Sequence, residues 1–250
     1  MAFSPDGTQL ASTSSDGTSR VWDAATGQSR FVLMSPGPSP GLGGVSWSLD
    51  GGRLAATPGG TTITVAETDT GRPQLSLEYP AFLQSVRFSP DATRLAGGGA
   101  AGMTLVWDAA SGTTLVTLDS RTTLVNGLAF SPDGRVLATT GNDGLVRLWD
   151  VASGRQLVAR SHGGSSFGVA FSPDSRRLAS SSVDRAVKLW AVAGHSLGDE
   201  EPLTLTGHTA AGTAWPGART AAGWQRPVAM GQAACTPWSS RTSWHWRAHV

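Results

Sequence analysis

The chain has 250 residues, of which 39% are hydrophobic and 15% are charged, with a formal net charge of +1. No apolar run approaches the length that spans a bilayer, and the N-terminus lacks the pattern of a secretory signal, so we expect a cytoplasmic protein with no membrane partner. The one cysteine, Cys235, excludes a disulfide framework.

Charge is unevenly distributed along the chain. Residues 1–201 carry 15 Lys and Arg against 18 Asp and Glu, a net of −3, whereas residues 202–250 carry four Arg and no acidic residue. A mildly acidic region does not favour contacts with a phosphate backbone, so we expect no nucleic-acid partner.

An aromatic residue followed by a turn of the type Ser-Pro-Asp-Gly recurs five times. Proline presets the first corner of such a turn, and glycine accepts the positive φ that the later corner needs. The aromatic residues, spaced 41 to 44 residues apart, are Phe3, Trp47, Phe88, Phe130 and Phe171. Abundant glycine and proline, at 32 and 14 residues, agree with frequent turns.

Each of these turns is followed by short apolar runs separated by further turns. The clearest copy, residues 128–150, reads LAFSPDGRVLATTGNDGLVRLWD. No helical spacing is sustained, so the runs predict strands in an antiparallel meander. The repeat region covers residues 1–208, with copies near 1–34, 42–79, 83–118, 124–160 and 165–206.

A four-stranded unit that repeats every 40 to 45 residues is typical of a β-propeller blade. With their Trp-Asp endings at Trp22, Trp107 and Trp149, the repeats resemble the WD40 family, in its bacterial form. The resemblance implies an all-β propeller with about five four-stranded blades and part of a sixth. Because Met1 lies inside a first strand, we expect a fragment of a seven-bladed or larger propeller.

Residues 209–250 depart from the pattern, with no Ser-Pro-Asp-Gly turn and five of the ten tryptophans. A shifted reading frame over residues 212–238 permits SPDGRWLATAGGDGTGRVYA, which aligns with residues 131–150 without a gap. We therefore interpret 209–250 as an irregular tail produced by a frameshift in a sixth blade. A truly divergent tail is the alternative.

In the WD40 family a buried polar network joins His before the first strand, Ser or Thr in the second, Asp in the next turn and Trp in the third. A buried carboxylate needs several hydrogen-bond donors, and the imidazole, hydroxyl and indole N–H groups of this set supply them. The resemblance assigns the network here to His162, Ser181, Asp184 and Trp190 in the fifth repeat, Thr140, Asp143 and Trp149 in the fourth, and Thr13, Asp16 and Trp22 in the first. We expect these residues to be structural.

Two repeats depart from this network. The second has Gly59 and Val65 at the Asp and Trp positions, and the third has Ala101 for Asp but retains Trp107. We expect these two blades to be softer than the others.

Two insertions interrupt the repeats. One is the proline-rich run 35–41, and the other is 195–201 after the fifth closing strand. Loops absorb insertions at low cost, so we expect both to be solvated surface segments.

Three short motifs match patterns of catalytic or ligand-binding sites, but none of them has the sequence context that such a site needs. Residues 97–102 satisfy G-x-G-x-x-G, but a strand follows where a helix is needed, so we expect a glycine-rich hairpin. Residues 164–168 satisfy G-x-S-x-G around Ser166, again without the strand-to-helix turn of a nucleophile elbow. His245 and His249 with Cys235 do not complete a zinc site, so no metal or cofactor is expected.

These observations favour a non-catalytic scaffold or sensor module that presents propeller loops to a peptide or protein partner. The resemblance places it within a larger bacterial regulatory protein, with no small-molecule substrate expected. Two alternatives stay open: a propeller hydrolase with Ser166 as nucleophile, and a non-functional gene remnant.

Overall fold

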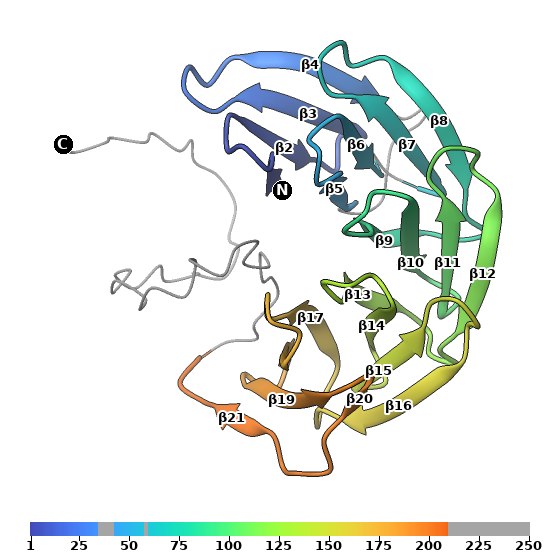
Figure 1. Ribbon diagram of the computed structural model, residues 1–250. Helices are drawn as coiled ribbons and strands as arrows, with labels where there is room; N and C mark the ends of the chain where they lie inside the picture. The colour runs from blue at the N-terminus through green and yellow to red at the C-terminus, as the bar shows by residue number, and fades with distance from the viewer. Residues whose placement is uncertain (35–42, 58–59, 210–250) are drawn as a thin grey trace.

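The computed structural model describes residues 1–34, 43–57 and 60–209, and these residues form strands and turns with no helix. The strands make five antiparallel sheets (Figure 1). Four are meanders in chain order, and in the fifth the last two short strands both pair with the third strand. Within these described ranges, no helix is long and apolar enough to cross a membrane. We number the sheets as blades 1 to 5.

The strands of each blade follow one another along the chain. Blade 1 contains β1 (Ala2–Phe3), β2 (Gln9–Thr13), β3 (Thr18–Asp23) and β4 (Ser29–Met34). Blade 2 contains β5 (Val45–Trp47), β6 (Arg53–Ala56), β7 (Thr62–Glu67) and β8 (Pro73–Glu78). Blade 3 contains β9 (Leu83–Phe88), β10 (Arg94–Gly99), β11 (Met103–Asp108) and β12 (Thr114–Asp119). Blade 4 contains β13 (Val125–Phe130), β14 (Val136–Gly141), β15 (Leu145–Asp150) and β16 (Gln156–Ser161). Blade 5 contains β17 (Ser166–Phe171), β18 (Arg177–Ser182), β19 (Val187–Ala193), β20 (Ser196–Leu197) and β21 (Leu203–Leu205).

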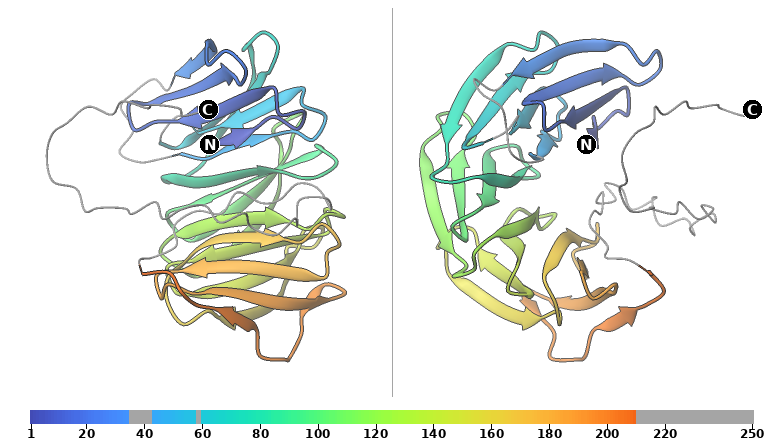
Figure 2. Two further views of the ribbon diagram at one scale, coloured as in Figure 1. Left: turned by 90° about the vertical axis from the view of Figure 1, so that its left-hand side faces the viewer. Right: turned by 180° about the vertical axis from the view of Figure 1, so that it is seen from behind.

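The five blades follow an arc, with their first strands on the inside and their last strands on the outside (Figures 1 and 2). Neighbouring inner strands contact one another, as between β9 and β13 and between β13 and β17. Blades 1 and 5 form the two ends of the arc. The predicted all-β propeller architecture is therefore confirmed, and the described residues form a partial propeller of five blades. The run 35–41, Gly59 and residues 210–250, which make up nearly all of the predicted irregular tail, lie outside the described residues.

The Ser-Pro-Asp-Gly turn has the same hydrogen bonds in every blade. In blade 4 the Gly134 amide donates to Ser131 O at 2.8 Å, and the Ser131 hydroxyl donates to Asp133 Oδ1 at 2.6 Å. The Val136 amide then donates to the Ser131 hydroxyl oxygen at 3.0 Å, which starts β14. Gly134 has a φ of +70°, a conformation that glycine adopts without strain.

The hydrophobic core lies between blades. Each of the four core clusters combines residues of two consecutive blades, as where Leu148 and Val158 of blade 4 pack with Leu178 and Trp190 of blade 5. Such a stack is stabilised mainly by contacts between nearest neighbours. Trp149, inside the stack, is 3% exposed, whereas Trp22, at the arc end, is only half-buried.

The sequence interpretation of blade 2 needs a correction of one residue. The register pairs Leu54 with Ala66, as it pairs Leu137 with Trp149 in blade 4. Ala66, not Val65, therefore stands at the tryptophan position. Adjacent strand residues point to opposite faces, so a one-residue shift in an alignment exchanges the faces.

The insertion 195–201 is also more structured than we expected. Ser196–Leu197 form β20, which pairs with the end of β19, and Leu197 is 2% exposed and packs into the core between blades 4 and 5. Asp199 pairs with Arg160 at 2.8 Å. The prediction of a wholly solvated loop was wrong, because one apolar side chain in the insertion reaches the core.

Candidate functional site

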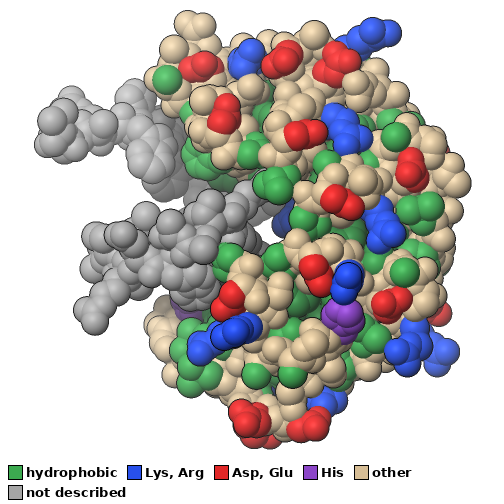
Figure 3. All heavy atoms as spheres, in the orientation of Figure 1, with side chains coloured by type: hydrophobic (Ala, Val, Ile, Leu, Met, Phe, Trp, Pro, Cys, Tyr) green, Lys and Arg blue, Asp and Glu red, His purple; other side chains and the backbone are tan. Residues whose placement is uncertain are grey.

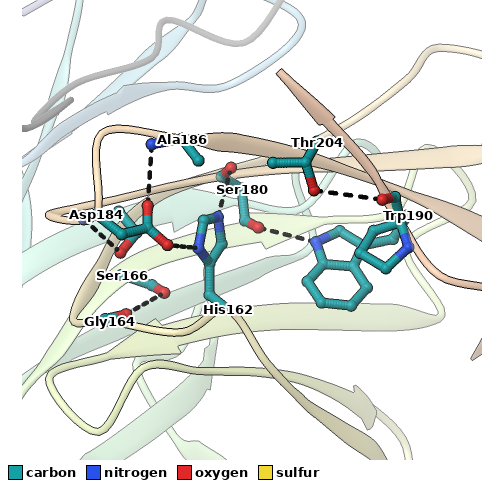
Figure 4. A network of polar contacts seen from close by, with 10 residues as sticks. His162, Gly164, Ser166, Ser180, Asp184, Ala186, Trp190 and Thr204 are labelled. Carbon is teal, nitrogen blue, oxygen red and sulfur yellow. Dashed lines mark hydrogen bonds and ion pairs between the residues drawn. The ribbon is translucent and has the colours of Figure 1, made fainter. Parts of the chain in front are cut away.

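The predicted polar network is most complete in blade 5, where it connects His162 with the Asp184 turn and with Ser180 of β18 (Figure 4). The His162 ring contacts Asp184 Oδ2 through Nδ1 and Ser180 O through Nε2, both at 3.1 Å. The Trp190 indole donates from Nε1 to the Ser180 hydroxyl at 2.8 Å. His162 is 1% exposed, and its ring lies edge-on to Trp190 with centroids 6.5 Å apart.

Both nitrogens of His162 face groups that accept hydrogen bonds. Burial works against ionisation of Asp184, but the hydrogen bonds from the Ala186 amide and from His162 outweigh it and lower the pKa of this carboxyl. The arrangement fixes the Asp184 turn against β18 and leaves His162 inaccessible to a substrate.

The hydroxyl that serves Trp190 is Ser180, and the assignment to Ser181 is corrected. Leu178 is the Cα partner of Trp190, so Ser180, two residues further along β18, lies on the same face as the indole. Ser181 points to the opposite face, where its hydroxyl oxygen accepts from the Gly168 amide at 3.1 Å.

Blades 1 and 4 show the same shift of one residue. Trp149 donates to the Thr139 hydroxyl and Trp22 to the Ser12 hydroxyl, each at 2.9 Å. The assigned residues serve the next blade instead. Thr140 donates to Phe167 O at 3.2 Å, and Thr13 donates to Gly43 O at 2.6 Å. These two hydroxyls therefore hold adjacent blades together.

Asp143 and Asp16 have partners other than histidine. Asp143 pairs with Arg147, which is 6% exposed, at 2.5 Å. Asp16 accepts from the amide and hydroxyl of Thr18 at 2.9 and 2.7 Å, and these bonds lower its pKa. Arg147 is a network residue that sequence reasoning missed, although its place four residues after Asp143 was visible.

Blade 3 replaces its missing aspartate with a contact that the sequence did not reveal. The Tyr79 hydroxyl lies 3.0 Å from Ala100 O and 2.7 Å from Met103 O, on either side of Ala101. Tyr79 precedes blade 3 as His162 precedes blade 5: the Tyr79 amide donates to Thr61 O and the His162 amide to Gly144 O. A phenol thus braces the turn that the carboxylate braces in blade 5.

The Asp of the Trp-Asp pair has a separate role in the next turn. Asp23 Oδ1 accepts from the Ala25 and Thr26 amides at 3.1 and 2.8 Å, and Asp108 accepts from two amides in the same way. Asp150 accepts from the Ser153 amide at 2.8 Å. These short side chains satisfy amides that the turn leaves unpaired.

Ser166 does not have the surroundings of a nucleophile. It is the first residue of β17, is 0% exposed, and its hydroxyl donates to Gly164 O at 3.2 Å (Figure 4). A nucleophile elbow needs an exposed hydroxyl on a strand-to-helix turn. The run 97–102 forms the hairpin between β10 and β11, as predicted.

Metal-ligating residues do not gather in the ranges 1–34, 43–57 and 60–209, which contain no group of three that could hold an ion. His195 lies 3.9 Å from Asp133, an exposed pair. Cys235, His245 and His249 lie outside the described residues.

Comparison with known families agrees with this geometry. The WD domain, G-beta repeat (WD40) model matches residues 1–23, 112–150 and 155–191. These three stretches are similar to WD40 repeats, and the described sheets have the four-stranded arrangement of WD40-like propeller blades. The matches cover β1–β3 and β12–β19 and leave out blade 2 and the first three strands of blade 3. No curated protein matches the chain.

Proposed function

We propose that this chain is a non-catalytic scaffold that presents the loops of its WD40 blades to a peptide or protein partner. WD40 repeats generally mediate protein–protein interaction, and a stack of rigid blades holds loops in fixed positions on two faces. The observation that carries the proposal is that the candidate catalytic side chains are already hydrogen-bonded within the fold. These residues have groups that a hydrolase could use: His162, Asp184 and Ser166. His162 and Ser166 are buried, and all three make hydrogen bonds within one blade.

The exposed surface supports a protein partner. On the face shown in Figure 3, acidic and basic side chains are interspersed over the blades, with no broad area of one sign. Nucleic-acid binding proteins present a concentrated basic patch. The proposal therefore includes no nucleic-acid partner. It also includes no small-molecule substrate, and it places the chain in the cytoplasm as part of a larger bacterial regulatory protein.

A peptide-display selection against the folded full-length chain tests the scaffold. We expect selected peptides to share a short consensus and to bind with micromolar dissociation constants, and surface substitutions to weaken them. A selection that enriches no consensus, with the chain shown to be folded, contradicts the proposal.

Two further measurements address the alternatives. A fluorophosphonate probe is expected to leave the chain unlabelled, since Ser166 is buried. Labelling that Ser166→Ala abolishes would instead establish a hydrolase. A cooperative thermal transition of soluble protein argues against a non-functional remnant.

A further inference from the structure

Three seams between consecutive blades are closed at their outer side by a glycine. The turns that follow β7, β11 and β15 contain Gly71, Gly112 and Gly154, with φ values of +71°, +76° and +71°. A Cβ built on Gly112 would lie 2.9 Å from Leu77 Cδ2 of the preceding blade, and one on Gly154 would lie 2.5 Å from Val116 Cγ2. Such distances leave no room for a side chain unless the neighbour moves. Glycine therefore lets these turns lie directly against the fourth strand of the preceding blade.

Blade 5 has the insertion 195–201 in place of this turn. By the strand register, Ala191 stands at the position of Asp150, whose carboxylate accepts from a turn amide in blade 4. The turn of blade 5 lacks this acceptor, and β19 continues to Ala193 and pairs with β20. Leu197 of β20 packs in the core between blades 4 and 5, and β20 contacts β16, the fourth strand of blade 4 (Figure 1). A side chain, not a glycine, therefore closes the outer side of this seam.

The facing strand of blade 4 also differs from its counterparts. At the register position of Arg160, the fourth strands of blades 1 to 3 carry leucines that are at most 5% exposed: Leu33, Leu77 and Leu118. The Arg160 side chain is 39% exposed, and its guanidinium pairs with the fully exposed Asp199 of the insertion at 2.8 Å. An exposed ion pair thus stands here where a buried apolar side chain stands in blades 1 to 3.

The inner side of the same seam is closed by buried hydrogen bonds. Asn126 Nδ2 of β13 donates to Ser166 O of β17 at 2.8 Å, and the Thr140 hydroxyl of β14 donates to Phe167 O at 3.2 Å. None of these four residues belongs to the insertion, so the two sides of the seam are held by separate sets of contacts. An exposed ion pair adds little stability, and the outer side can therefore open at lower cost than the inner side.

We propose that residues 195–201 form a latch that opens the outer side of the seam between blades 4 and 5 while the inner side stays closed. In the open state Leu197 leaves the core, the ion pair between Arg160 and Asp199 is broken, and β20 separates from β16. The inner strand β17 stays on blade 4. The latch is a conformational device of the fold and does not depend on the proposed scaffold function.

Hydrogen exchange of the full-length chain, followed by NMR, tests the latch. The Gly198 amide donates to Ala191 O at 2.9 Å, a bond that is broken when β20 moves away, so this amide reports opening. The His162 and Gly168 amides, bonded to Gly144 O and to the Ser181 hydroxyl, report the inner part of the seam. We expect the Gly198 amide to exchange at least about tenfold faster than the other two. One common rate for all three amides would mean that the insertion opens only with the whole fold, and would overturn the proposal.

Two charge variants distinguish a latch from a loop that is simply exposed. Asp199→Asn and Arg160→Gln each remove one partner of the ion pair, and each should speed exchange of the Gly198 amide about two- to fivefold, as expected for an exposed pair. The double variant should add nothing further, because the pair is already lost. Glu201→Gln, an exposed acidic residue of the same insertion, is the matched control and should change nothing. If Gly198 does not respond to Arg160→Gln, a change on the neighbouring blade, the latch is refuted.

Leu197→Ala removes the apolar contact of the latch. It should speed exchange of the Gly198 amide about tenfold or more, because the seam loses a buried side chain. The His162 and Gly168 amides should change by less than about twofold, since they belong to a separate set of contacts. Equal acceleration of all three amides would show that Leu197 supports the whole fold, which contradicts the proposal.

Salt provides a further test on the unmodified chain. Raising the salt from about 50 mM to about 1 M screens the pair between Arg160 and Asp199, so exchange of the Gly198 amide should become faster. The same change should have no effect on Gly198 in Asp199→Asn. An equal response in both proteins would mean that the ion pair does not hold the latch.

Discussion

The indole of Trp190 donates to the Ser180 hydroxyl at 2.8 Å, while the adjacent Ser181 hydroxyl faces away from it and accepts from Gly168. Two neighbouring serines thus have different partners, although either fits the sequence pattern of the network. The difference is measurable as a coupling energy.

The first prediction is a double-mutant cycle between Trp190→Phe and each serine. Ser180→Ala leaves the buried indole N–H without its partner, which should lower the free energy of unfolding by about 1–2 kcal/mol. Its coupling with Trp190→Phe should be about 1 kcal/mol, and that of Ser181→Ala close to zero, from urea denaturation. A larger coupling for Ser181 would contradict the register described here.

The second prediction concerns Tyr79, the one tyrosine of the chain. Burial raises its pKa to about 12 from the ordinary 10.0. Between these values the unfolded chain loses the phenolic proton while the folded chain keeps it, so the stability present below pH 10 should decline as the pH rises toward 12. Ultraviolet absorption titrates this group alone, and urea unfolding at each pH follows the stability.

Tyr79→Phe is the control for this effect. It should lower stability at neutral pH by about 1 kcal/mol, because the carbonyls of Ala100 and Met103 lose a donor, and it should remove this part of the alkaline decline. A phenol that titrates near 10 in the folded protein would show that Tyr79 is not held in this way.

The third prediction uses the repeated turn. Ser175 has a φ of +59° where Gly134 has +70° in the preceding blade. A side chain in this region is strained by about 1 kcal/mol, so Ser175→Gly should raise stability by about 0.5 kcal/mol after the greater chain entropy of glycine is included. Thermal melting measures the change.

Gly134→Ala is the matched substitution in the opposite direction. A Cβ at Gly134 meets only Pro90 Cδ at 3.7 Å, an ordinary contact, so the expected loss of about 1 kcal/mol reports backbone strain alone. If both substitutions shift the melting temperature in the same direction, positive φ is not the controlling factor at this turn.

The fourth prediction compares two tryptophans of the same register position. Trp149 is 3% exposed between blades 3 and 4, and its replacement by alanine should lower stability by about 3–5 kcal/mol. Trp22 is half-buried at the arc end, so Trp22→Ala should lower it by roughly half as much. Circular dichroism during urea unfolding gives both values, and equal losses would mean that the ends of the arc are as well packed as its middle.

Local sequence was enough to predict the strands and their grouping. Residues 128–150 alone hold two turns with defined φ requirements and three apolar runs, and their repetition predicted the five blades. Turn formation and strand alternation depend on residues close together in the chain, which is why such features can be read without coordinates.

Contacts between strands were predicted less well. Asp184 contacts His162 and Trp190 donates to a serine hydroxyl, but in three blades the hydroxyl that the tryptophan contacts lies one residue before the assigned one. The reason is physical: a shift of one residue changes the face of a strand but hardly changes a sequence pattern in which Ser and Thr stand side by side.

The sequence by itself determined the blade as a unit, because its turns and alternation are local. Only the tertiary structure decided which contacts each blade makes with its neighbour. Tyr79 braces a turn of the next blade, and Leu197 reaches a core from within an insertion. Arg53 donates to a carbonyl of blade 3, whereas Gln9, at the same register position in blade 1, lines a cleft between blades 1 and 2. These outcomes depend on distances across a seam between residues far apart in the chain, and only packing of the blades sets those distances.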